Sequence, residues 1–171
     1  MSKTPTIKNI PFSLQQREHQ IQWRKDNISS SKPGKQNGDY YKHIIPKNIW
    51  YESIWEGIRT DLIEYLKINN IQPHTGTHNL LSSWVLCANL YFPIRTDVNL
   101  RLLMTTFLKE KVSDQITEIT DVELEYAFPA EDPCHPYLLL GEKDGNRGSG
   151  QTSPDVAFKI KTKTGKGIIL T

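Results

Sequence analysis

Residues 155–171 read DVAFKIKTKTGKGIILT, and this stretch decides the fold of the C-terminal part of the chain. From Asp155 to Lys161, larger apolar residues alternate with polar residues and an alanine, which predicts a half-buried strand. Residues 162–165 are polar and end in glycine, so they predict a tight turn. Because the apolar run 167–171 follows this turn directly, the stretch predicts two adjacent antiparallel strands.

A second alternating pattern lies upstream of this hairpin. Apolar residues occupy every second position from Val122 to Phe128, with Asp, Glu and Ala between them, which predicts a strand over residues 121–128. Residues 137–140 predict a short further strand. The run 167–171 ends without a polar terminator or a covering element, which indicates a polypeptide that stops within a domain. A competing interpretation is an edge strand that pairs with a partner chain.

Before residue 117 the apolar residues recur every three or four positions, which predicts three helices. The first follows Pro46 and ends at residues 69–70, where asparagine tolerates the left-handed conformation. Thr77 caps the second helix, and Pro93 closes it. The third is capped by Thr96 or Asp97, and its apolar stripe is Leu100, Leu103, Met104, Phe107 and Leu108. The expected fold class is α+β, with an N-terminal helical layer and a small antiparallel or mixed sheet.

Length and composition narrow the class of protein. A chain of 171 residues with 37% hydrophobic content suits one soluble domain. No apolar run approaches the roughly 18 residues that cross a bilayer, and the first twenty residues lack a secretory signal, so no membrane contact is expected. Cys87 and Cys134 form no CxxC pair, which disfavours a disulfide scaffold or a structural zinc site and suits a reducing, cytoplasmic location.

The charge is distributed unevenly. Residues 1–47 hold nine Lys and Arg against three Asp and Glu, whereas the rest of the chain holds twelve against sixteen. With few periodic apolar positions, residues 1–46 are expected to be a basic flexible arm on a folded domain of residues 47–171. Such an arm can release counterions from nucleic acid phosphates, with Arg24 and Lys25 beside a tryptophan. A solvated terminus without a partner explains the charge as well.

Acidic residues at strand ends suggest a metal site. Neighbouring antiparallel strands can bring the carboxylates at their ends within a few ångströms of each other, and Mg²⁺ prefers oxygen ligands. Asp155 opens one predicted strand. Glu123 and Glu125 lie two residues apart on one face of another strand, where either could be a further ligand. The alternatives are an aspartate that bonds its own backbone at a strand start, and glutamates on the solvent side of an edge strand.

The segment Gly148–Phe158, GSGQTSPDVAF, together with the hairpin and the final apolar strand, resembles the PD-(D/E)xK superfamily of restriction-endonuclease-like nucleases. The resemblance implies Mg²⁺-dependent hydrolysis of DNA phosphodiesters, with Asp155 as a catalytic metal ligand. In that superfamily a strand like the last one leads into Glu-x-Lys or Asp-x-Lys. These residues would fall at or beyond Thr171, so the resemblance implies an incomplete core that is truncated before the second half-motif.

Two functions therefore remain open at this level. The first is a DNA endonuclease that uses Mg²⁺ and no small-molecule cofactor, is weak or inactive as an isolated chain, and has Arg24, Lys25 and the loop residue Arg147 as DNA contacts. The second is a non-enzymatic module that binds nucleic acid or protein through its basic arm and its open edge strand.

Overall fold

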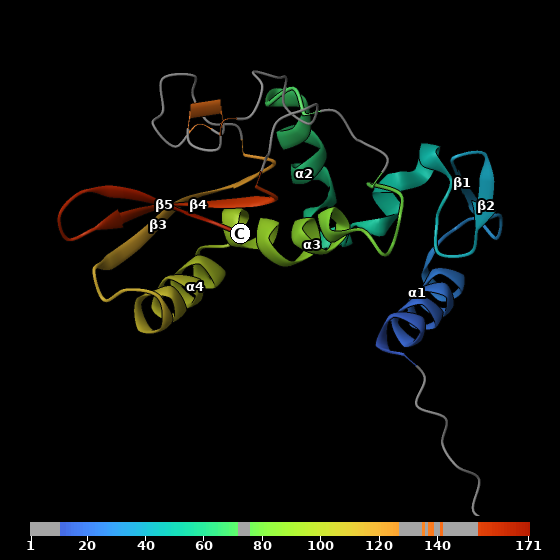
Figure 1. The fold of residues 1–171 in the computed structure, drawn as a ribbon, viewed down its shortest axis with the longest axis horizontal. Coiled ribbons are helices and arrows are strands. Elements are labelled where there is room, and N and C mark those ends of the chain that lie inside the picture. The colour runs from blue at the N-terminus through green and yellow to red at the C-terminus, as the bar shows by residue number, and fades with distance from the viewer. Residues whose placement is uncertain (1–10, 72–75, 127–134, 136, 139–140, 142–153) are drawn as a thin grey trace, which may run out of the picture.

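The computed structural model describes residues 11–71, 76–126, 135, 137–138, 141 and 154–171. Figure 1 shows strands β3 to β5 at one end of the molecule beside helices α3 and α4, and helix α1 with the β1–β2 hairpin at the other end. This arrangement confirms the α+β class. The elements are α1 (Phe12–Asn27), β1 (Gly34–Gln36), β2 (Asp39–Tyr41), the 3-10 helix η1 (Lys47–Ser53), α2 (Glu56–Ile68), α3 (Ser83–Thr96), α4 (Val98–Lys111), β3 (Ile116–Leu124), β4 (Val156–Thr162) and β5 (Lys166–Leu170).

The larger sheet has the order β3-β4-β5, with β4 in the centre. Both pairings are antiparallel, and Phe158 lies opposite Val122 on one side and Ile169 on the other. The turn from β4 to β5 is closed by Thr162, whose N–H donates to Gly165 O at 2.7 Å and whose hydroxyl accepts from Gly165 N at 3.1 Å. The predicted hairpin is confirmed, and β5 is an edge strand within the part of the chain that the structure describes.

Strand β3 begins at Ile116 rather than at residue 121. Its register shifts twice against β4, between Ile116 and Glu118 and again between Ile119 and Asp121. Each shift places an extra residue on β3, so that buried residues recur three positions apart in this half of the strand. These irregularities break the period of two and explain why the pattern missed the first half of β3. Residues 127–128 of the predicted strand lie outside the described part.

The predicted short strand over residues 137–140 is wrong where the structure describes it. Tyr137 and Leu138 are helical. The Leu138 N–H donates to His135 O at 2.9 Å, which is a bond of a helical turn rather than of a strand pairing. Residues 139–140 lie outside the described part.

The main core lies between α2, α3, the single buried side chain of α4 and one face of the sheet. Helix α2 confirms the later part and the end of the first predicted helix, and Asn70 follows it with φ 52°. Its predicted start after Pro46 is wrong, because residues 47–53 form the separate helix η1 and Ile54 is extended. The Tyr65 ring of α2 packs on Phe92 of α3, with the ring centroids 5.3 Å apart. Within the described residues, none of the helices combines the length and apolar character required to span a bilayer.

Helix α3 differs from its prediction at both ends. The cap is Ser82, whose hydroxyl accepts from Trp84 N, and not Thr77. Pro93 lies inside the helix rather than closing it. A proline removes only its own N–H and disturbs the turn before it, and its carbonyl still accepts from Asp97 N at 2.9 Å. The helix therefore continues to Thr96.

Helix α4 is capped by Asp97, one of the two predicted caps. The predicted apolar stripe is mostly not in the core, because Leu108 is its only buried member and Leu103 and Phe107 are 68% and 52% exposed. The helix packs along β3, with Leu108 buried and Met104 partly buried against the core, while the remaining side of its apolar stripe faces solvent.

Residues 11–46 contain regular structure, which corrects the expectation of an arm without it. α1 buries only Ile21 and Arg24, so its sequence carries little apolar periodicity. The Ser-rich segment after it is bound to η1, because Ser29 N and Oγ both donate to the Glu52 carboxylate, at 2.7 and 2.6 Å. Asn37 and Gly38 both have positive φ, 53° and 92°, and form the tight turn of the β1–β2 hairpin.

Candidate functional site

Asp155 lies in a bend immediately before β4, at the end of the sheet where β3 finishes. The pairing of β3 with β4 continues past both strands, because Glu125 N donates to Asp155 O at 3.0 Å and Tyr126 N donates to Pro154 O at 3.1 Å. These two bonds place the backbone of Asp155 beside that of Glu125. The strand predicted to begin at Asp155 begins one residue later, at Val156.

Strand β5 ends at the same edge of the sheet. Thr171 N donates to Val156 O at 3.0 Å, and Val156 N donates to Thr171 O at 3.2 Å. Because β4 is antiparallel to both neighbours, its first residue meets the last residues of β3 and β5. Three strand ends therefore converge at Asp155.

Helix α3 adds Cys87 to this end of the sheet. Its Sγ lies 4.0 Å from Asp155 Oδ2, within reach of a weak S–H···O contact. Burial raises the pKa of the Cys87 thiol, and the negative charges of Asp155 and Glu125 raise it further. Both carboxylates thus lie close enough to this thiol to disfavour its ionised form.

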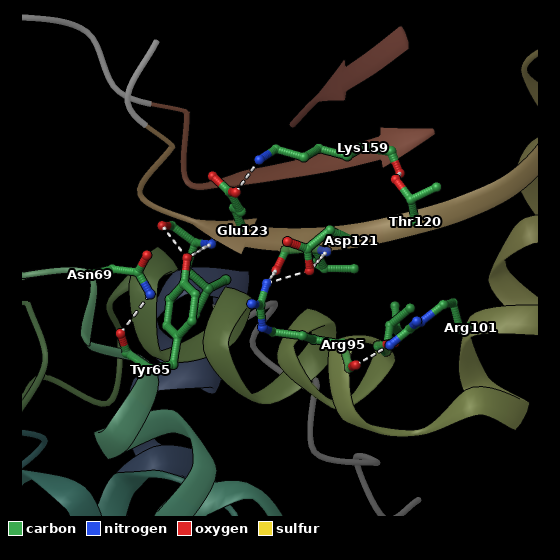
Figure 2. A network of polar contacts seen from close by, with 11 residues as sticks. Tyr65, Asn69, Arg95, Arg101, Thr120, Asp121, Glu123 and Lys159 are labelled. Carbon is green, nitrogen blue, oxygen red and sulfur yellow. Dashed lines mark hydrogen bonds and ion pairs between the residues drawn. The ribbon is translucent and has the colours of Figure 1, made fainter. Parts of the chain in front are cut away.

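Glu123 and Glu125 do not share a strand face, contrary to the expectation from their spacing. β3 ends at Leu124, and Glu125 has φ 51°, a left-handed conformation that is uncommon outside glycine and redirects its side chain. Glu123 remains in β3 and forms an ion pair with Lys159 of β4, on the face away from the helices (Figure 2). The hydrogen bond to Glu123 raises the pKa of Lys159, against a smaller lowering by burial.

The pair Asp155 and Glu125 suits one particular kind of cation site. Within the ranges that the structure describes, no group of three or more His, Cys, Asp or Glu is arranged to hold a metal ion. Mg²⁺ commonly keeps several waters and takes one or two carboxylates together with substrate phosphates. Two carboxylates at a converging sheet end fit that partial ligand set, whereas they do not form an all-protein cage.

The comparison with protein families assigns the chain to a family. Residues 17–171 match the family described as Restriction Endonuclease associating with ARP. The chain belongs to this family. The match includes most of the N-terminal region as well as the whole of the sheet. No curated protein and no solved structure matches the chain.

In this member of the restriction endonuclease family, the acid-x-Lys half-motif is missing from the sequence itself. None of the 19 Asp and Glu residues is followed two positions later by lysine. Lys159, the lysine nearest to Asp155 along β4, forms an ion pair with Glu123 on the face of the sheet away from the helices. A nearby lysine that could polarise an attacking water is therefore not supplied by β4.

The predicted DNA contacts of this family member have different surroundings. Arg24 is 5% exposed, and its guanidinium donates to Ser30 O and Ser31 O at 3.2 and 3.0 Å, so it holds the following loop instead of facing solvent. Burial also lowers the pKa of Arg24. Lys25 is exposed on the same helix. Arg147 lies outside the described residues.

A polar network on the helix side of the sheet supports the end of β3 (Figure 2). The Tyr65 hydroxyl accepts from Leu124 N at 3.1 Å and donates to Leu124 O at 3.3 Å. The Arg95 guanidinium lies over the Tyr65 ring, 4.7 Å from its centroid, and pairs with Asp121. Sequence reasoning missed this network because its members come from three elements and no local pattern links them.

Proposed function

We propose that this chain carries the metal-binding half of a Mg²⁺-dependent DNA endonuclease of the PD-(D/E)xK type. Asp155 binds the metal ion and Glu125 assists it. The observation that carries this proposal is the position of Asp155 and Glu125, whose backbones pair where the ends of β3 and β5 meet the start of β4 and whose charges both act on the Cys87 thiol. The membership in a restriction endonuclease family supports the class of reaction.

Each group has a limited task in this proposal. Mg²⁺, when bound, lowers the pKa of a coordinated water and neutralises charge on the scissile phosphodiester. Asp155 and Glu125 orient the ion by their carboxylate oxygens. The second acid and the lysine would be supplied by a partner at the β5 edge. The isolated chain is accordingly a weak or inactive nuclease that still binds the metal.

The Asp155→Asn variant tests this assignment. We expect it to weaken Mn²⁺ or Mg²⁺ binding at least tenfold in calorimetry, because one anionic oxygen ligand is lost. The matched control is Glu118→Gln, which removes one carboxylate from the same sheet. Glu118 is exposed and pairs with Lys161 at the far end of β3. This control should bind within about twofold of the wild type, since its change lies away from the strand ends.

The thiol of Cys87 provides a second readout in the same experiment. In a Cys134→Ser background, a cation at Asp155 and Glu125 offsets the charges that raise the pKa of Cys87, so alkylation of Cys87 becomes faster. The acceleration should occur in the Cys134→Ser chain and vanish when Asp155→Asn is added to it. Equal metal affinity in the wild type and Asp155→Asn, with no effect of metal on alkylation, would overturn the metal site.

A second candidate function is supported by the surface of α4. Leu100, Leu103 and Phe107 are spaced three and four residues apart on one face of this helix and are 38%, 68% and 52% exposed. Such an apolar strip is typical of a surface that binds another protein. We propose that it contacts the ARP partner named in the family description, which would make the chain a binding module in addition to a nuclease part.

The paired substitution Leu103→Ser and Phe107→Ser tests the α4 surface. We expect about a tenfold loss of coexpressed ARP in copurification with no change in thermal stability, because both side chains are exposed. The control pair is Leu86→Ser and Leu90→Ser on α3, with the same spacing and with 64% and 55% exposure. Equal retention of ARP by the α4 pair and the wild type would contradict the assignment.

A further inference from the structure

A cavity lies at the β1–β2 hairpin. Figure 1 shows this hairpin at the opposite end of the molecule from the sheet β3–β5. The cavity has a volume of about 440 Å³, which is within the range of small-molecule sites. The hairpin contributes Lys35, Gln36 and Tyr40, and the opposite wall is formed by Lys47 and His78. The family match and the metal site do not assign it a role.

His78 is the buried member of this cavity. It is 4% exposed, and its Nε2 lies 3.3 Å from the Lys35 carbonyl oxygen. Because a carbonyl only accepts, Nε2 carries the hydrogen. The other nitrogen, Nδ1, is buried and has no hydrogen-bond partner among the described residues. Buried polar atoms are almost always bonded, so an unsatisfied one in a cavity wall indicates a ligand group.

The chemistry of the walls favours an anion. The residues that line the cavity include Lys35 and Lys47 and no carboxylate. The Lys35 Nζ lies 4.7 Å above the Tyr40 ring, which holds the ammonium close to the hairpin. Gln36 and Asn37 add amide donors. Two cations and several neutral donors together match the oxygens of a phosphate.

The hairpin is rigidly attached to the wall that carries His78. Gly34 N donates to Ile44 O at 2.7 Å, and Ile45 N donates to His78 O at 2.9 Å. Residues on both walls are therefore fixed relative to each other by backbone hydrogen bonds. A site held in this way needs little reorganisation to receive a ligand.

We propose that this cavity binds the phosphate group of a nucleotide or of a nucleic acid strand. His78 lies in the wall beside the phosphate, with Nε2 bonded to Lys35 O and Nδ1 available to a polar group of the ligand. Lys35 and Lys47 neutralise the phosphate charge at the mouth of the cavity. This site does not use Asp155 and is independent of the metal site.

The test uses the full chain and three probes: inorganic phosphate, 5′-dAMP and a single-stranded thymidine octamer. Binding is measured by calorimetry and by NMR shifts of the His78 ring. His78→Gln keeps a donor for Lys35 O and removes Nδ1, and we expect it to weaken phosphate and 5′-dAMP about tenfold. Lys47→Gln, a surface change, should weaken both several-fold. Its matched control is Lys42→Gln, an exposed lysine outside the cavity lining, which should change little.

The probes also distinguish the two sources of phosphate. Binding of 5′-dAMP with no competition from the octamer supports a free nucleotide, and competition between them supports a strand. The proposal is overturned if neither phosphate nor 5′-dAMP shifts the His78 ring. It is also overturned if Lys42→Gln weakens binding as much as Lys47→Gln. If His78→Gln does not fold, the ring shifts in the wild type and the Lys47 and Lys42 variants decide the question.

Discussion

Gly34→Ala is expected to lower the free energy of unfolding by about 3 kcal/mol, at the upper end of the range for overpacked sites. A Cβ at this position would lie 2.0 Å from Ile45 O and 2.5 Å from Ile45 C, which are backbone atoms that cannot move aside like a flexible side chain. Ile44 and Ile45 are fully buried. Relief of the clash must therefore shift the chain that joins β2 to η1.

Urea denaturation of the wild type and Gly34→Ala measures this loss as a lower midpoint at an unchanged slope. The control is Gly165→Ala, because a Cβ there meets no atom within 4 Å and Gly165 has no positive φ. That variant should be neutral or gain up to about 1 kcal/mol from the restricted unfolded chain. A midpoint for Gly34→Ala equal to that of the wild type would show that the hairpin is not held against Ile45.

The sequence predicted the elements whose signals are local. The β4–β5 hairpin follows from alternation and a polar turn, and α2 follows from helical spacing that ends at an asparagine. A further local signal was available in Asn37–Gly38, because this dipeptide favours a hairpin turn with two positive φ angles. This dipeptide would have identified the hairpin that lines the cavity beside His78.

Other elements depend on tertiary contacts that no local window contains. The packing of α1 depends on the buried Ile21 and Arg24 and on Trp23, which contacts the cluster of Ile28, Ile45 and Leu80, and no apolar stripe predicts it. The early part of β3 is hidden by two register shifts, which only the partner strand reveals. The helical spacing in α4 was correctly recognised, but spacing alone does not say which side chains of the apolar stripe are buried against the sheet.

The candidate metal site was predictable in part. Asp155 was placed correctly at a strand start, since the residues after it alternate. The different roles of Glu123 and Glu125 were not predictable, because they depend on the end of β3 and on one left-handed residue. Cys87 lies 68 positions before Asp155, and only folding brings the two together.

Tyr65→Phe is expected to lower the free energy of unfolding by about 2 kcal/mol. The hydroxyl bonds both the N–H and the carbonyl of Leu124, and both ends of this contact are buried. Loss of a hydroxyl that serves a buried donor and acceptor costs their desolvation as well as the bond. The ring remains, so its packing on Phe92 and beneath Arg95 is retained and the loss reports the hydroxyl alone.

Tyr65→Phe should also affect the metal site, because Leu124 immediately precedes Glu125. Amide exchange at Leu124 should become faster, and Mn²⁺ affinity should fall less than in Asp155→Asn, since no ligand is removed. The matched control is Tyr91→Phe. The Tyr91 ring packs against Phe158 with the ring centroids 5.7 Å apart, and the Tyr91 hydroxyl makes no hydrogen bond within the described part of the chain. It should change the free energy of unfolding by less than about 0.5 kcal/mol. Equal stability of the two variants would show that the bonds from Tyr65 do not hold the end of β3, and the position of Glu125 would then depend on its pairing with Asp155 alone.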